Sequence, residues 1–157
     1  MPAMTPGLTI ELLWPSVLRR YIGASAALHL IWEIAQQPLY TIWSAPLSSR
    51  ALAVLHCTIG DLMIASLSLL AALAIVDRPD WPRTGLRSVW LLLFVIGAGY
   101  TVYSEWFNVN VRGSWAYGPL MPTLPLLGTG FTPLLQWLVV PSLTLRIAAR
   151  HSPWRTT

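Results

Sequence analysis

The scarcity of charge along the chain is the feature that most constrains its fold. Only 10% of the 157 residues are Asp, Glu, Lys or Arg, whereas 55% are hydrophobic. An ordinary soluble domain is about one quarter charged, because its surface faces water. We therefore expect a lipid bilayer, rather than water, to surround much of this chain.

Four apolar stretches are long enough to form membrane-crossing helices, which need about 20 mostly apolar residues each. They are residues 20–43, 51–76, 88–108 and 124–147. The segments between them contain proline, together with glycine or serine, and such clusters mark turns. The sequence predicts an all-α polytopic membrane protein, with one domain over residues 1–157 and a four-transmembrane-helix bundle with short connections. Residues 8–18 are expected to form a separate short helix at the membrane surface.

The arginines predict the orientation of this bundle. Of the ten basic residues, only Arg50 and Arg112 fall on one side of the four-span arrangement. Those on the other side are Arg19, Arg20, Arg78, Arg83, Arg87, Arg146, Arg150 and Arg155. Because positive loops stay on the cytoplasmic side, we expect cytoplasmic termini and a bacterial-type inner membrane. Arginines at helix ends meet anionic lipid head groups, so the net charge of +4 does not indicate a nucleic-acid partner.

Tryptophan and cysteine add two smaller constraints. Six tryptophans lie near the predicted span ends, where aromatic side chains anchor to the membrane surface. They are Trp14, Trp43, Trp81, Trp106, Trp115 and Trp154. The single cysteine, Cys57, excludes an intramolecular disulfide and any site built from several cysteines.

A stripe of polar residues runs along the first apolar stretch. It consists of Ser25, His29, Glu33, Gln36, Gln37 and Tyr40. These positions share one face of a helix, and polar groups in hydrocarbon need partners, so we expect this face to point into the bundle. Pro38 lacks the N–H that would bond to Ile34, which predicts a local kink beside Glu33.

The other three stretches carry polar residues as well. In the third stretch they share a face, formed by Gly97, Thr101, Ser104, Glu105 and Asn108. The aligned residues of the fourth are Thr129, Thr132 and Gln136, and Pro133 and Pro141 are expected to bend that helix. His56 and Asp61 of the second stretch are about 140° apart around a helix, so the spacing leaves open whether they flank one cavity.

The depth of these residues suggests acid–base chemistry. At 1.5 Å per residue, Glu33 and Asp61 both lie about 14–15 Å below the non-cytoplasmic surface. A charged carboxylate in mid-bilayer costs about 2.5–3.5 kcal/mol, so we expect these acids to face inward, find partners and hold a proton. The candidate catalytic residues are Glu33, His29, Asp61 and Glu105. The candidate substrate-binding residues are Gln36, Gln37, His56, Asn108, Trp106, Gln136 and Trp137.

The segment "LHLIWE" (28–33) resembles the emopamil-binding, or sterol-isomerase, membrane family. Members of that family carry a His-x-x-x-Glu pair on a membrane helix, which would be His29 and Glu33 here. The resemblance implies that Glu105 or Asp61 is the second acid of the pocket. Where the family has Asn-x-x-Trp on its last helix, this chain has Gln136 and Trp137 side by side.

The resemblance also implies a reaction that moves a double bond. A protonated acid would give its proton to an alkene, a cation would form, and a second base would remove a proton elsewhere. The aromatic face that stabilises the cation would belong to Trp32, Trp106 or Trp137.

The leading prediction is an intramembrane isomerase or cyclase, without a cofactor, that acts on an apolar lipid or isoprenoid. One alternative is a protein that binds haem or a metal ion through His29 or His56, although their depths differ by about 14 Å. Another is a carrier or a small subunit of a membrane complex, either of which could form a homo-oligomer. In a purely structural interpretation, His29 and Glu33 only form hydrogen bonds that hold the helices together.

Overall fold

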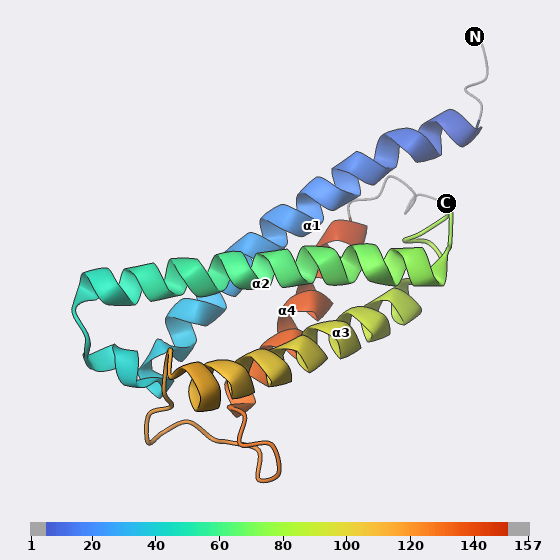
Figure 1. The fold of residues 1–157 in the computed structure, drawn as a ribbon. Helices are drawn as coiled ribbons and strands as arrows, with labels where there is room; N and C mark the ends of the chain where they lie inside the picture. The colour runs from blue at the N-terminus through green and yellow to red at the C-terminus, as the bar shows by residue number, and fades with distance from the viewer. Residues whose placement is uncertain (1–5, 151–157) are drawn as a thin grey trace.

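Four long helices make up most of the described chain. The computed structural model describes the backbone of residues 6–150 and, among the side chains, those of residues 16–149. The helices are α1 (Pro6–Gln36), α2 (Leu47–Val76), α3 (Leu86–Trp106) and α4 (Phe131–Arg150). Each helix packs against its two neighbours in the ring α1–α2–α3–α4 (Figure 1). The predicted all-α fold class is confirmed, and the described residues include no β-sheet.

Three of the described helical segments are long and apolar enough to cross a membrane. They are Leu47–Val76, Leu86–Arg112 and Phe131–Ala149. The sequence predicted a fourth such span over residues 20–43, which overlaps α1. Only residues 21–36 of α1 follow Arg20, and the polar stripe occupies one face of this part. Only the outward face of residues 21–36 is apolar, so the composition of α1 is not apolar enough to count as a membrane-crossing helix.

The ends of α1 differ from the prediction. The helix is continuous from Pro6, so residues 8–18 are the beginning of α1 and not a separate helix. It stops at Gln36 rather than at residue 43, and two 3₁₀ turns, Gln37–Leu39 and Thr41–Ser44, lead to α2. Because Pro38 cannot donate a helical hydrogen bond, the expected kink is in fact the end of the helix.

The start of α4 also differs from the prediction, since residues 124–130 form a turn before the helix. The Leu124 N–H donates to the Thr129 carbonyl at 2.9 Å, and Gly128 has the left-handed φ of 62° that this tight turn requires. Pro133 lies in the first turn of α4, where an N–H has no helical partner, so it starts the helix rather than bending it. Pro141 does lie inside the helix.

An apolar core fills one half of the bundle, towards the α2–α3 loop. Its buried members are Val17, Tyr21, Ala65, Leu69, Ala72, Trp81, Val89, Leu93, Trp137, Leu145 and Ala148. We call this part the apolar half. Trp81 is only 5% exposed, so it packs into the core and does not form the membrane-surface anchor that was expected. The side chains of Trp14, Arg150, Trp154 and Arg155 lie outside the described residues.

Candidate active site

A cavity of about 620 Å³ occupies the other half of the bundle, which we call the cavity half. All four helices contribute to its lining. Glu33 of α1, Asp61 of α2 and Glu105 of α3 line it together, and Gln136 lines it from α4. Acids far apart in the sequence therefore converge on one hollow. His56 also lines the cavity, so it shares this space with Asp61 despite their different helix faces.

The polar stripe of α1 points inward over its whole length. Ser25, His29 and Glu33 are buried, with His29 completely inaccessible to solvent. On the opposite face, Ile31 is 62% exposed and Ile34 is 57% exposed. This arrangement is the reverse of an amphipathic helix in a water-soluble protein, where the apolar face is buried.

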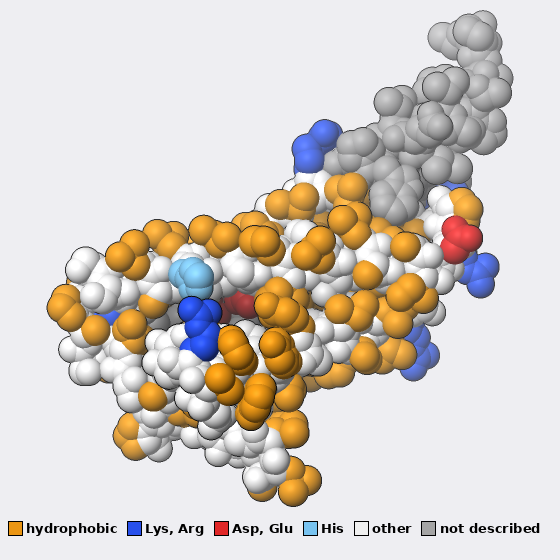
Figure 2. Space-filling model, in the orientation of Figure 1, with side chains coloured by type: hydrophobic (Ala, Val, Ile, Leu, Met, Phe, Trp, Pro, Cys, Tyr) orange, Lys and Arg blue, Asp and Glu red, His pale blue; other side chains and the backbone are white. Residues whose placement is uncertain are grey.

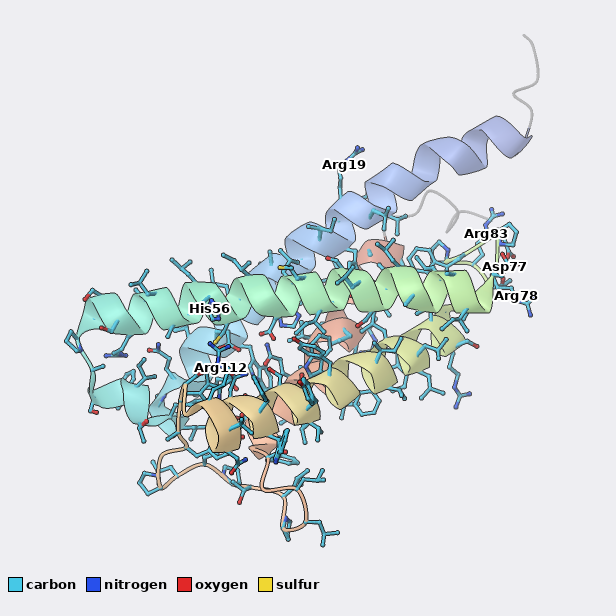
Figure 3. All side chains as sticks on the ribbon, in the orientation of Figure 1. Arg19, His56, Asp77, Arg78, Arg83 and Arg112 are labelled. Atoms are coloured by element: carbon cyan, nitrogen blue, oxygen red, sulfur yellow. The ribbon has the colours of Figure 1, made fainter. Side chains whose placement is uncertain are left out.

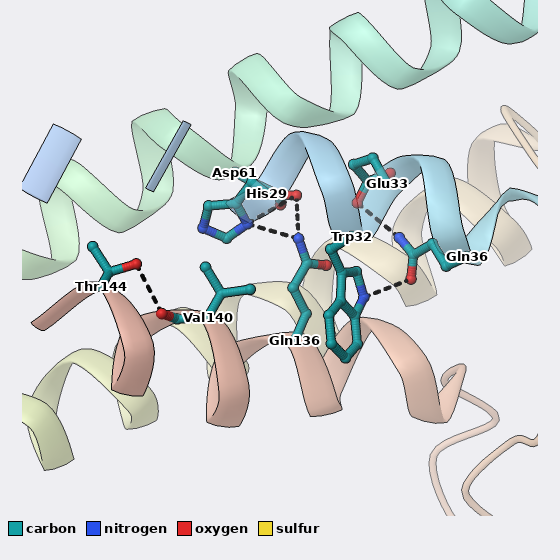
Figure 4. A network of polar contacts seen from close by, with 8 residues as sticks. All are labelled: His29, Trp32, Glu33, Gln36, Asp61, Gln136, Val140 and Thr144. Atoms are coloured by element: carbon teal, nitrogen blue, oxygen red, sulfur yellow. Dashed lines mark hydrogen bonds and ion pairs between the residues drawn. The ribbon is translucent and has the colours of Figure 1, made fainter. Parts of the chain in front are cut away.

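The side chains of His29, Asp61 and Gln136 form a network that joins three helices (Figure 4). The Gln136 Nε2 atom lies 2.7 Å from His29 Nδ1 and 2.7 Å from Asp61 Oδ2. The Nδ1 and Oδ2 atoms are themselves 3.5 Å apart. An amide NH₂ has two protons to donate, so Gln136 can contact both the His29 ring and the Asp61 carboxyl group at once. His29 does not line the cavity and reaches it through Gln136 and Asp61.

A second hydrogen-bonded chain orients Glu33. The Trp32 indole N–H donates to Gln36 Oε1 at 3.1 Å, which fixes the amide of Gln36. The Gln36 Nε2 atom then donates to Glu33 Oε1 at 2.7 Å (Figure 4). The carboxyl groups of Glu33 and Asp61 are close enough to interact electrostatically. Glu33 and Asp61 therefore lie near each other on the lining of one cavity, as paired acid–base groups require.

The third acid is held by the segment of residues 113–130, which we call the cap. The Tyr117 hydroxyl donates to Glu105 Oε2 and accepts the Gly130 N–H at 2.9 Å. Burial raises the pKa of Tyr117, and the hydrogen bond to Glu105 raises this pKa further, so the phenol keeps the proton that it donates. Tyr117 does not line the cavity itself, but its hydroxyl contacts Glu105, which does.

The cap is also tied to the end of α1. The Gly118 N–H donates to the Leu39 carbonyl at 2.8 Å, and the Thr41 N–H donates to the Ala116 carbonyl at 3.0 Å. Trp115 of the cap lines the cavity. These contacts hold the cap against the end of α1, beside the cavity.

The structure separates the remaining candidate binding residues into two groups. Gln37 and Asn108 line the cavity but also have structural bonds: Gln37 Nε2 donates to the Arg50 carbonyl at 2.7 Å. Asn108 Nδ2 donates to the Ser104 carbonyl at 2.9 Å. Trp106 and Trp137 do not line the cavity. Trp106 is 49% exposed on the outside of α3, and Trp137 is fully buried in the apolar half.

Arg112 and Cys57 also line the cavity, although neither residue was predicted to belong to the site. Arg112 follows Asn108 by four residues in the π-helical turn Phe107–Arg112, so both side chains face the same way. That helical spacing was a usable signal for Arg112. Tyr117 had none, because it reaches Glu105 through the path of a loop.

No cluster of three or more His, Cys, Asp or Glu side chains suited to a metal ion occurs among the described residues. His29 is buried and bonded through Nδ1 to Gln136, while His56 is exposed at the cavity edge. A haem or metal ion bound through either histidine stays a prediction.

No family model matches the chain, and no curated protein or solved structure matches it either. The resemblance of residues 28–33 to the emopamil-binding family therefore depends on those residues alone.

Proposed function

We propose that this chain is a multi-pass membrane enzyme that performs acid–base chemistry on an apolar lipid or isoprenoid, as an isomerase or cyclase does. The observation that carries the proposal is the convergence of Glu33, Asp61 and Glu105, from three helices, on one cavity. Such groups are costly to bury in an apolar bundle, and intramembrane acids commonly mark functional sites.

Membrane insertion is supported by the surface as well as by helix length. Large apolar side chains such as Leu55, Ile59 and Met63 of α2 are more than half exposed. Figure 2 shows hydrophobic side chains spread along the helices, with basic side chains mainly at the α2–α3 end. We propose that α1 is a fourth crossing helix, since its apolar face points outward. By the arginine distribution, the α2–α3 loop and both termini would be cytoplasmic in a bacterial-type inner membrane.

A lipid could enter this cavity from the side, between α2 and α3. Leu52 and Ile64 of α2 and Tyr100 of α3 line it together with the acids. Figure 2 shows a hollow in this surface with carboxylate atoms visible inside. An apolar lining with a few convergent polar groups is typical of small-molecule sites, and this volume lies within their usual range.

The network geometry suggests a division of roles. Glu33, bonded to Gln36, would deliver a proton to the substrate double bond. Asp61, held by Gln136 and supported by His29, would remove a proton from another carbon, and the two steps together move the double bond. Glu105, which accepts from Tyr117, would be the alternative base on the cap side of the cavity.

Substitution of Glu33 by Gln tests the proposal, because the amide keeps the size of the side chain but cannot deliver the proton. Lipid extracts from cells that express the wild-type chain or Glu33→Gln would be compared by mass spectrometry. We expect the wild-type chain to produce an isomeric lipid that falls about 10²- to 10⁴-fold with the variant, which is the usual contribution of general acid–base catalysis.

Asp77→Asn is the matched control, since it makes the same chemical change at an exposed acid beyond the cavity. Asp77 has a φ of 45°, which asparagine also tolerates. The control should keep full activity. Unchanged lipid products with folded Glu33→Gln protein would contradict the proposed role of Glu33.

A further inference from the structure

The two arginines of the cavity half differ in how they are held. The Arg50 guanidinium lies 3.6 Å from the centre of the Trp43 ring, and its Nε donates to Gln37 Oε1 at 3.1 Å. Arg112 has no carboxylate partner within ion-pairing distance among the described residues. It is exposed, yet it lines the cavity. Arg50 therefore has a structural task, whereas the charge of Arg112 remains available to a ligand.

His56 lies opposite Arg112 at the edge of the same cavity. His56 belongs to α2 and Arg112 to the turn that extends α3, and both line the cavity. Figure 3 shows the two residues near each other between α2 and the turn that extends α3, and Figure 2, in the same orientation, shows a His and a basic side chain beside the surface hollow. The cavity entrance thus has a cationic group on one side and an imidazole, a hydrogen-bond donor, on the other.

We infer that this cavity binds an amphiphile with an anionic head group, a phosphate or carboxylate, which Arg112 and His56 hold at the entrance. This inference rests on the proposed function and narrows its substrate class. Guanidinium forms strong, often bidentate hydrogen bonds with phosphate and carboxylate, while the apolar chain would lie against Leu52, Ile64 and Tyr100. The head group would stay apart from the acids, so the reacting carbon atoms could reach Glu33 and Asp61.

The binding test uses the full chain in a non-ionic detergent and three probes. Dodecyl phosphate has both the charge and the chain, dodecanol has the chain alone, and inorganic phosphate has the charge alone. Native mass spectrometry would measure the bound fraction at equal mole fractions of the two amphiphiles. We expect dodecyl phosphate to bind about tenfold more tightly than dodecanol, consistent with one charge-assisted contact. Inorganic phosphate should not compete, since it lacks the chain.

Three variants assign this preference to Arg112. Arg112→Gln should reduce the preference for dodecyl phosphate to about twofold or less, and Arg112→Lys should retain part of it because the charge remains. Arg87→Gln is the matched control, since Arg87 is exposed at the opposite end of α3. It should leave the preference unchanged. Equal binding of the two amphiphiles to the wild-type chain, or an equal loss in Arg87→Gln, would overturn the inference.

Two further measurements separate the ligand source and the two proposals. Displacement of dodecyl phosphate by excess phosphatidylglycerol would identify a bulk membrane lipid as the occupant, and its retention would identify a dedicated single-chain amphiphile. Both results support an anionic head-group site.

Glu33→Gln should bind dodecyl phosphate normally. If Glu33→Gln binds dodecyl phosphate normally but leaves the lipid products unchanged, the proposed chemistry fails while the head-group site stands. If Glu33→Gln abolishes the isomeric lipid but the wild-type chain does not prefer dodecyl phosphate to dodecanol, the head-group site fails while the proposed chemistry stands.

Discussion

The apolar half and the cavity half are built from the same four helices, yet they are packed differently. In the apolar half, Ala65 and Leu69 of α2 and Val89 and Leu93 of α3 belong to one buried cluster. In the cavity half, α2 and α3 line opposite sides of a hollow that contains Asp61 and Glu105. The comparison suggests that dense packing at one end stabilises the bundle, so that the other end can keep costly polar groups and empty space in fixed positions.

The largest stability effect is expected from Leu93→Ala in the apolar half. Leu93 is fully buried within the core cluster, so its truncation leaves a void that the neighbouring helices cannot fill. We expect the free energy of unfolding to fall by about 2–5 kcal/mol, measured by denaturation in detergent micelles.

Cys57→Ala is the matched truncation in the cavity half. Cys57 is half-buried and lines a hollow that already exists, so its removal should cost less than about 1 kcal/mol. Equal losses of stability in the two variants would show that the two halves do not differ in this way.

A smaller but equally local effect is expected at the glycines. A Cβ atom at Gly97 would lie 2.1 Å from Cε3 of Trp137, whose ring is fully buried. At Gly60, on the cavity lining, an added Cβ meets no atom within 4 Å. Gly97→Ala should therefore reduce the free energy of unfolding by about 1–3 kcal/mol through overpacking. Gly60→Ala should raise it by about 0.5–1 kcal/mol, because alanine favours the helix. Thermal unfolding of both variants measures these changes. If both variants were stabilised, or both destabilised, the two halves would not differ in packing as described.

The contrast between the halves also explains what could be predicted from the sequence. The polar face of α1 was predictable, because His29, Glu33 and Gln36 recur at helical spacing and buried polar groups need partners. The similar depths of Glu33 and Asp61 were also predictable, whereas their meeting in one cavity was not, because depth alone does not fix lateral position. These predictions depend only on helix periodicity and on the energetic cost of burying charge.

The loops were less predictable, because their paths depend on contacts between distant residues. Trp81 packs into the apolar half since the α2–α3 loop folds back, and no local pattern signals that path. Tyr117 reaches Glu105 because the cap bonds to Leu39 and Thr41, which lie more than 70 residues earlier in the chain. Residues 124–130 were apolar enough to be included in a helix, but their glycines favoured a turn.

Tyr117→Phe tests the coupling of the cap to the cavity half. Without the hydroxyl, Glu105 and the Gly130 N–H each lose a partner, so the free energy of unfolding should fall by about 1 kcal/mol at neutral pH. Amide hydrogen exchange at Gly130 should accelerate. An unchanged exchange rate would show that the cap is held without this hydrogen bond.

The same variant makes a prediction about alkaline pH. Burial, followed by the hydrogen bond to Glu105, raises the folded-state pKa of Tyr117 above the ordinary value of about 10, although the Gly130 N–H partly opposes this. The folded protein therefore holds this proton more tightly than the unfolded chain, and the resulting stabilisation is present below about pH 10 and lost as pH rises through the folded-state pKa. Above pH 10, the free energy of unfolding should fall less steeply with pH in Tyr117→Phe than in the wild-type chain, as measured by denaturation at a series of pH values. Equal slopes for the two proteins would contradict the raised pKa of Tyr117.

The smallest effect is expected from Trp106→Ala, which distinguishes the outside of α3 from its cavity face. Trp106 is 49% exposed and pairs with Tyr103 on the outer surface, whereas the next residue towards the N-terminus, Glu105, faces the cavity. Stability should change by no more than about 0.5 kcal/mol, and lipid product by less than about twofold. If Trp106 instead stabilised a cationic intermediate, the loss of a desolvated cation–π contact of about 2 kcal/mol would lower the product about thirtyfold. The lipid assay used for Glu33→Gln separates these outcomes, and a thirtyfold loss would require α3 to rotate so that its present outer face lines the cavity.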